Sequence, residues 1–249
     1  MQTIAGIQNT TGPEPLSIVI ECVSCRKRLS VKDRDTYLDS DTNGAGIFCP
    51  RCDRKLTFQK LPEDRQELVL QEQIPELFWD ARLEHLSETL QKEITTLQPG
   101  QGMFLYGSPG IGKSYAMAAM MREFIREGFT VQRIDYDMLL LMIRDTFKPT
   151  ATLTELQVIL PYIQADKLII EDVGTTVRGR DEETAFSLRT FLIILDQRIL
   201  NCKATFITSN KSVADIAKSF DDRVASRLST FKNFRFEGKD KRIDRSKKL

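Results

Sequence analysis

A phosphate-binding loop between a short apolar strand and a helix constrains the fold of this chain more than any other feature. The run 103–106 (MFLY) is apolar, and residues 107–114 (GSPGIGKS) satisfy the pattern G-x4-G-K-[ST]. Glycines in such a loop let backbone N–H groups wrap phosphate oxygens, and the N-terminus of the next helix adds a favourable dipole. Because a helix is expected over Tyr115–Glu127, the sequence predicts a parallel α/β sheet with a nucleotide site at its edge.

Each part of this loop has an expected task. Lys113 neutralises the β- and γ-phosphates, and the Ser114 hydroxyl ligates Mg²⁺. The residues expected to bind the nucleotide here are Gly107, Ser108, Pro109, Gly110, Ile111, Gly112, Lys113 and Ser114.

Two carboxylates at the end of a second apolar run supply the next part of the site. Residues 167–172 read KLIIED, and a continuous apolar run is typical of a buried parallel strand. Carboxylates at its end are suited to Mg²⁺ ligation and water polarisation beside the phosphates. We assign Glu171 to Mg²⁺ and Asp172 to the attacking water.

A third apolar run ends in small polar residues. Residues 204–208 lead into Ser209-Asn210, one long predicted helix (Asp181–Leu200) after the acidic strand. A polar side chain at this place in P-loop ATPases orients the attacking water, so Asn210 is a candidate catalytic residue.

Strand and helix signals alternate through the rest of the chain, which favours a five-stranded parallel sheet with the site at the carboxyl ends of its strands. Helices are expected at Met138–Phe147 and at Leu153–Gln164, the latter opened by a capping box of Thr152 and Glu155. The expected strands are 103–107, 130–134, 167–172, 204–209 and 233–236.

Four of the five cysteines form two C-x2-C pairs near the N-terminus. They are Cys22 with Cys25, and Cys49 with Cys52. In a chain without a secretory signal this spacing predicts a tetrahedral zinc site rather than disulfides. Apolar runs beside the pairs predict flanking strands, so we expect a zinc ribbon stabilised by its metal. The runs are 18–20, 47–48 and 56–58. A site that has lost its metal and a redox dithiol pair are the alternatives.

Composition and charge suggest how the chain is organised. Residues 232–249 carry 8 Lys/Arg against 3 Asp/Glu, whereas residues 61–231 carry 19 against 25, an asymmetry typical of polyanion contact or of a solvated tail. No apolar run approaches the roughly 20 residues of a membrane span, and the N-terminus lacks the pattern of a secretory signal, so we expect a cytoplasmic protein. The expected parts are a disordered tail (1–15), a zinc-ribbon-like module (16–60), a linker (61–73), an ATPase core (74–236) and a basic C-terminal tail (237–249).

Together these motifs resemble the AAA+ ATPases, and within them the DnaC/IstB group of bacterial helicase loaders and transposition helpers. The resemblance runs from Ile74 to the C-terminus. Residues 107–114 are similar to Walker A, 168–174 to Walker B, and 209–210 to sensor 1. The guanine-reading pattern N-K-x-D is absent, because Ser212-Val213 follows Asn210-Lys211.

Further segments resemble the family. Residues 74–83 are similar to its segment beside the adenine, where Trp79 is interpreted either as a stacking residue or as a core anchor. Residues 222–228 resemble the box VII helix, which implies that Arg227 is an arginine finger for ATP in the neighbouring subunit. Residues 236–242 resemble the short closing segment. The resemblance implies ATP, Mg²⁺ and a homo-oligomer in the ATP-bound state.

This chain departs from the family pattern in three places. Glu171 stands where the family usually has Asp, and Asp240 stands where a small polar residue is more usual. Only 13 residues follow Phe236, too few for the helical lid of larger AAA+ proteins, so we expect a core without a full lid.

Three functions fit this resemblance. The leading hypothesis is an ATP-dependent loader of a replicative helicase onto single-stranded DNA, whose N-terminal zinc module grips the helicase. The second is a transposition helper ATPase that acts on duplex DNA. The third is an ATP-binding adaptor whose Glu171 site hardly hydrolyses ATP.

Overall fold

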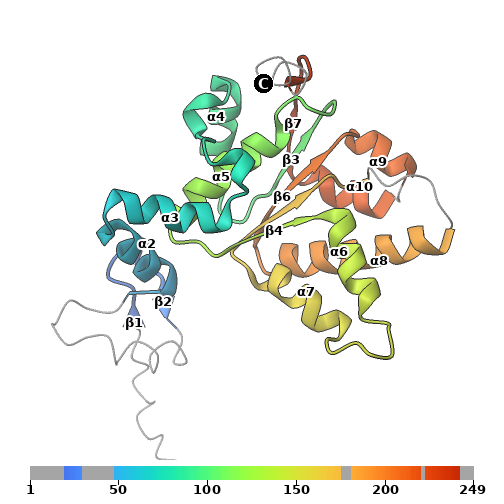
Figure 1. Cartoon of the computed structure of the whole chain (residues 1–249), viewed down its shortest axis with the longest axis horizontal. Coiled ribbons are helices and arrows are strands. Elements are labelled where there is room, and N and C mark those ends of the chain that lie inside the picture. The colour runs from blue at the N-terminus through green and yellow to red at the C-terminus, as the bar shows by residue number, and fades with distance from the viewer. Residues whose placement is uncertain (1–19, 30–47, 175–180, 220–221, 242–249) are drawn as a thin grey trace, which may run out of the picture. The chain divides into compact units, whose positions relative to one another are not determined.

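The structure is a computed structural model of the 249-residue chain, and it describes residues 20–29, 48–174, 181–219 and 222–241 (Figure 1). The chain divides into two compact units, Met1–Asp53 and Arg54–Leu249. The expected disordered tail lies outside the described residues. None of the described helices is long and apolar enough to span a membrane.

A parallel five-stranded sheet forms the centre of the second unit, in the order β4-β5-β6-β3-β7 (Figure 1). Tyr106 at the end of β3 lies beside Ser209 and Arg235, so the carboxyl ends of three strands are level. The expected five-stranded parallel fold is confirmed. The strands are β3 (Met103–Tyr106), β4 (Val131–Asp135), β5 (Lys167–Glu171), β6 (Ala204–Ser209) and β7 (Lys232–Arg235).

Helices connect these strands close to the positions expected from the sequence. Helix α8 has the expected bounds, and α5 begins two residues earlier than expected, at the lysine of the phosphate loop. The helices of the second unit are α3 (Glu63–Gln73), α4 (Glu88–Thr95), α5 (Lys113–Arg126), α6 (Tyr136–Asp145), α7 (Glu155–Gln164), α8 (Asp181–Leu200), α9 (Val213–Ser219) and α10 (Asp222–Ser229).

The two faces of the sheet pack into two separate apolar cores. Along β5, Leu168 and Ile170 join the core formed with α6, α7, α8, α9 and α10, whereas Ile169 joins the core formed with α3, α4 and α5. This follows from the pleat of a strand, which sends successive side chains to opposite faces. Because both faces are covered, each central strand has the continuous apolar sequence from which it was predicted.

The capping box of α7 lies two residues after the expected one. Thr154, not Thr152, is the N-cap, and its partner is Gln157. Both pairs satisfy the T-x-x-[EQ] pattern of a capping box. The helix begins at Glu155, and the residue directly before it, Thr154, is therefore the N-cap.

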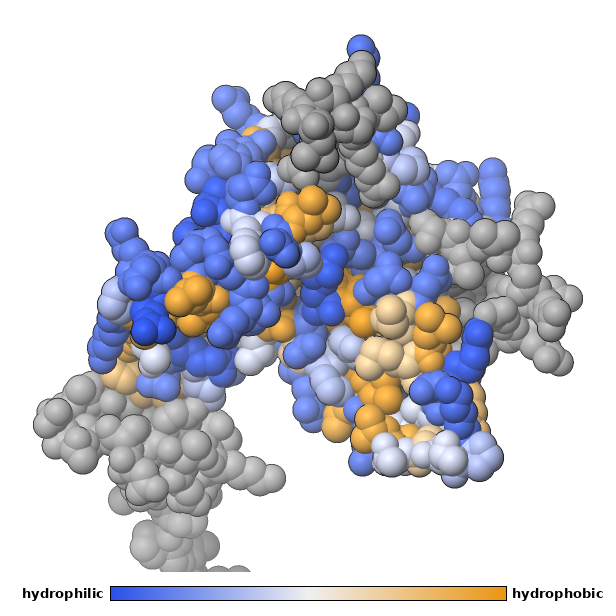
Figure 2. Space-filling model, in the orientation of Figure 1, coloured by the Kyte–Doolittle hydropathy of each residue, from blue (hydrophilic) through white to orange (hydrophobic). Residues whose placement is uncertain are grey.

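Figure 2 shows the apolar residues that stay on the surface over α6 and α7. They include Met138, Leu141, Leu156 and Leu160.

The first unit contains a short antiparallel hairpin and the beginning of a helix. Strand β1 (Ile20–Glu21) pairs with β2 (Arg28–Leu29), and the second cysteine pair lies at the start of α2 (Pro50–Lys60). The expected strand at 56–58 is therefore wrong, because those residues belong to α2. Proline is favoured in the first turn of a helix, and an acidic first turn with a basic last turn complements the helix dipole.

Candidate nucleotide and zinc sites

Glycines shape the phosphate loop where β3 turns into α5. Gly110 has φ +73°, and Gly112, the N-cap of α5, has φ +113°. Residues with a Cβ atom rarely adopt these backbone conformations. The loop residues from Pro109 to Tyr115 line a cavity of about 680 Å³. The backbone therefore has the form that the motif predicts for a phosphate site.

Lys113 brings two of the predicted motifs into contact. Its side chain is 6% exposed, and Nζ donates hydrogen bonds to the carbonyl oxygens of Gly107 at 2.8 Å and Ser108 at 2.9 Å. The same Nζ donates to Oδ1 of Asn210 at 2.8 Å. The lysine of the phosphate loop and the polar residue after β6, 97 residues apart in sequence, thus lie at one point.

The two carboxylates of the acidic strand have different surroundings. Asp172 lines the cavity with φ +56°, and its amide donates to the Thr208 hydroxyl on β6 at 3.0 Å. Glu171 is buried and does not line the cavity. Its Oε1 accepts a hydrogen bond from Nε of Arg133 on β4 at 2.6 Å. Arg133 is a partner that the sequence analysis missed, since only the alignment of β4 beside β5 brings it near.

Apolar and aromatic residues from the segment before α4 form a wall of the cavity. Leu77, Phe78 and Leu86 contribute to this wall, and a cavity of this size and character is typical of small-molecule sites. Trp79 is not among the lining residues. Its Nε1 donates to the Ile74 carbonyl at 3.0 Å, but the residue is 36% exposed, so Trp79 is not the core anchor that the sequence also suggested.

His85, the only histidine in the sequence, lies in this cavity wall. Its Nδ1 is 2.7 Å from the hydroxyl of Tyr115, and the two rings stack with centroids 6.3 Å apart. The Tyr115 hydroxyl also lies 3.1 Å from the Asp80 carbonyl, to which it donates. Tyr115 follows the phosphate loop directly, and that position was the one sequence signal that could have identified the pair.

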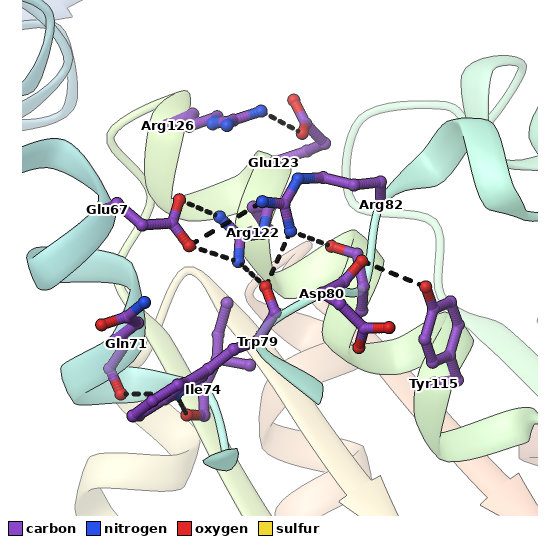
Figure 3. A network of polar contacts seen from close by, with 11 residues as sticks. Glu67, Gln71, Ile74, Trp79, Asp80, Arg82, Tyr115, Arg122, Glu123 and Arg126 are labelled. Atoms are coloured by element: carbon purple, nitrogen blue, oxygen red, sulfur yellow. Dashed lines mark hydrogen bonds and ion pairs between the residues drawn. The ribbon is translucent and has the colours of Figure 1, made fainter. Parts of the chain in front are cut away.

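A buried arginine of α5 binds α3 and the segment before α4 (Figure 3). Arg122 is fully buried, and its guanidinium donates to both carboxylate oxygens of Glu67 on α3, at 2.7 and 3.0 Å. It also donates to the Trp79 carbonyl, and Arg82 approaches Glu67 at 3.8 Å. The hydrogen bond from Arg122 lowers the pKa of the Glu67 carboxyl. The network fixes α3 and the segment before α4 onto the helix that carries the phosphate loop.

Arg227 lies at a second cavity, of about 470 Å³, whose lining shares no residue with the first. Its Nε and Nη2 donate to the two carboxylate oxygens of Asp196 on α8, at 2.5 and 3.0 Å. Nη1 donates to the Arg223 carbonyl at 3.0 Å. The structure therefore brings Lys113, Asp172 and Asn210 together and places Arg227 elsewhere.

The four N-terminal cysteines form one cluster whose sulfur atoms all lie within 4.8 Å of one another. Cys22 closes a turn, accepting a hydrogen bond from the Arg26 amide at 2.9 Å, and Cys25 Sγ is 3.7 Å from Cys49 Sγ. All four are free thiols, and four convergent sulfurs from two C-x2-C pairs are the ligand set that Zn²⁺ prefers.

The environment of these thiols separates their pKa values. Burial acts to raise the pKa of Cys22, but hydrogen bonds with the backbone of Cys25 and Cys49 outweigh it and lower the pKa to about 6. Burial and the neighbouring sulfur of Cys49 raise the pKa of Cys52 to about 12. Four thiolates at such short range repel one another unless a cation compensates their charge, which is what a bound Zn²⁺ does.

The fold and the first cavity define the class of this protein: an ATP-binding domain with a P-loop at the carboxyl edge of a five-stranded parallel sheet. The family model of the IstB-like ATP binding proteins matches residues 81–228, more than half of the 249 residues, and the chain belongs to that family. The predicted resemblance is confirmed.

Relatives and solved structures agree with this assignment. The chain is 25% identical over 122 residues to the replicative helicase loader DnaC of Escherichia coli K12, with 49% of this chain and 47% of that protein covered. The match thus spans about half the length of the curated relatives. A crystal structure of the DnaC helicase loader has a TM-score of 0.53 at 21% identity, with 66% of this chain and all of that chain covered. The replication initiator DnaA bound to AMPPCP and single-stranded DNA has a TM-score of 0.55 at 20% identity, covering 68% and 54%. At these identities the solved structures show the fold alone.

Proposed function

We propose that this protein is an ATP-dependent loader of a replicative helicase onto single-stranded DNA. The observation that carries the proposal is the meeting of Lys113, Asp172 and Asn210 at one cavity, in a chain whose curated relatives are helicase loaders. The DnaA structure that shares the fold holds an ATP analogue and single-stranded DNA, which supports the same ligands here.

The cavity supports a switch that is set by ATP binding and reset by hydrolysis. Lys113 donates to two loop carbonyls and to Asn210, and phosphate oxygens of ATP would replace those acceptors. Asn210 would then remain beside the outer phosphate, where its amide orients the attacking water. Asp172, which lines the same cavity, is the proposed acceptor of that water's proton.

Mg²⁺ would be held by the Ser114 hydroxyl and Glu171, and it would neutralise charge on the outer phosphates. Ser114 lines the cavity, which fits this role. Glu171 would have to exchange its ion pair with Arg133 for the metal or a metal-bound water. Because Arg133 and Mg²⁺ compete for Glu171, we expect slow ATP hydrolysis. Slow hydrolysis is compatible with a switch that acts through ATP binding.

Arg227 is the proposed finger for ATP held by the next subunit of an ATP-bound homo-oligomer. Its location at a cavity separate from the chain's own phosphate loop supports action in trans. A planar guanidinium that is always charged matches the charge that develops on the transferred phosphoryl group.

The zinc-ribbon-like module is the proposed grip for the helicase. Its hairpin and four-cysteine cluster belong to the first compact unit, whereas all residues that line the ATP cavity belong to the second. The basic segment at the C-terminus, with 8 Lys/Arg against 3 Asp/Glu in residues 232–249, supports contact with the DNA backbone.

ATP turnover with and without single-stranded DNA, together with binding to the replicative helicase of the same organism, tests this function. We expect single-stranded DNA to stimulate turnover, and we expect the helicase to bind the wild type but not Cys49→Ser. Duplex-specific stimulation, combined with binding to a transposase, would favour the transposition helper, which the matched IstB-like family supports. Helicase binding without measurable turnover would leave the adaptor function.

A further inference from the structure

The last described residues of the chain lie on the phosphate loop. The six residues that follow β7, 236–241, are held by backbone hydrogen bonds at both ends, one to the last residue of β3 and one to the phosphate loop. The Phe236 amide donates to the Tyr106 carbonyl at 2.7 Å, and the Lys241 amide donates to the Gly110 carbonyl at 3.0 Å. This segment therefore passes over the loop that the motif assigns to phosphate.

The carboxylate of Asp240 is in direct contact with Gly110. A Cβ atom built on Gly110 would lie 1.8 Å from Oδ1 and 2.5 Å from Oδ2 of Asp240, so the carboxylate fills the space that a side chain at this position would need. A Cβ atom on Gly112 would lie 3.7 Å from Nζ of Lys241. A carboxylate and the cation of the next residue thus both lie against the glycines of the loop.

The loop is built to attract anions, and one carboxylate already lies on it. Successive backbone N–H groups in a turn with positive φ form an anion-binding concavity, and the N-terminus of α5 adds its dipole. A phosphate bound to the loop would lie next to the Asp240 carboxylate, and like charges repel at short range. An oligophosphate and Asp240 therefore do not share the loop without a cost in free energy.

We propose that segment 236–241 is an intramolecular competitor of the nucleotide phosphates, and that Asp240 sets the affinity for ATP. Binding of the triphosphate moves Asp240 away from Gly110 and breaks the Lys241 hydrogen bond to the same residue. This inference rests on the proposed ATP site and adds that the chain's own C-terminal segment limits its occupancy.

Asp240→Asn tests the competition, because it keeps the shape of the side chain and removes its charge. We expect the Kd for ATP, measured by calorimetry with Mg²⁺, to fall about fivefold, the size of one like-charge contact in a site open to water. The matched control is Glu237→Gln. That carboxylate also lines the cavity, but it is exposed, lies 3.4 Å from Arg235 and supplies none of the three atoms nearest a Cβ on Gly110, so the Kd of this variant should change less than about twofold.

Hydrogen exchange provides an independent measurement without nucleotide. Amides of the 107–114 peptide should exchange faster in Asp240→Asn than in the wild type, because the segment is held less firmly on the loop. Unchanged or weaker ATP binding by Asp240→Asn would overturn the inference, as would equal tightening by Glu237→Gln or unchanged exchange. A failure of the proposed loader function is distinguishable from a failure of this inference. If the loader function is wrong, the Kd values for ATP should still differ as stated, and only the helicase-loading assay should fail.

Discussion

The buried Arg122–Glu67 ion pair gives a quantitative prediction for stability. Glu67→Ala leaves a fully buried guanidinium without its carboxylate, although the hydrogen bond to the Trp79 carbonyl remains. Removing one partner of a buried pair costs about 3–5 kcal/mol. Glu67 is 33% exposed, and solvent screening reduces this cost, so we expect a loss of about 2–3 kcal/mol in the free energy of unfolding.

Thermal and urea unfolding followed by circular dichroism measure this loss. For a unit of 150–250 residues, 1 kcal/mol corresponds to about 2–4 °C, so the Tm should fall by about 4–12 °C. Glu123→Ala is the matched control. It removes a carboxylate that pairs with Arg126 on the same helix, with side chains 34% and 39% exposed, and should cost at most about 1 kcal/mol. A loss for Glu67→Ala no larger than that of the control would refute the reasoning.

The same pair predicts a pH dependence. The Arg122 hydrogen bond lowers the pKa of Glu67 below its ordinary value of 4.5. A carboxyl group whose pKa is lower in the folded state than in the unfolded state stabilises the fold. This contribution to the free energy of unfolding is complete above the pKa of the unfolded state, and it is lost as the pH falls through the pKa of the folded state. Below about pH 4.5, wild type should lose stability more steeply than Glu67→Gln. Parallel curves for the two proteins would contradict this contribution.

Four further predictions concern the two sites. Lys113→Ala should weaken ATP binding at least tenfold in calorimetry, and retained affinity would exclude Lys113 from the phosphate site. Asp172→Asn should bind ATP as the wild type does and lose most turnover, whereas turnover at the wild-type rate would remove its assignment to the attacking water. Cys49→Ser should abolish bound zinc in elemental analysis while ATP binding persists, and full zinc content would contradict the four-cysteine site. Mixing Arg227→Ala with Lys113→Ala should restore partial ATPase activity across one interface. No recovery in mixed oligomers that demonstrably form would reject action in trans.

The sheet could be predicted from sequence because its strands are continuous apolar runs buried on both faces. Strands β3, β5 and β6 lie within one residue of their expected bounds for this reason. The hairpin unit was predicted less well, since its short apolar runs are ambiguous between strand and helix. Residues 56–58 were expected in a strand, but they lie in α2, which begins at a proline.

Within the nucleotide site, the motif residues could be predicted and their partners could not. The phosphate loop, Asp172 and Asn210 follow strands whose carboxyl ends must meet at one edge, so their proximity follows from topology. Contacts such as Glu171 with Arg133, Arg227 with Asp196, and Asp240 with Gly110 depend on side-chain packing between distant segments. No local pattern encodes such contacts.

Helicase loading onto closed circular single-stranded DNA tests the central claim most directly. A closed circle has no end, so a ring-shaped helicase can encircle it only if the ring is opened. The account predicts that wild-type protein with ATP leaves the replicative helicase bound to the circles after gel filtration, and that Lys113→Ala does not. Equal amounts of bound helicase with wild type, with Lys113→Ala and with no added protein would contradict an ATP-dependent loader.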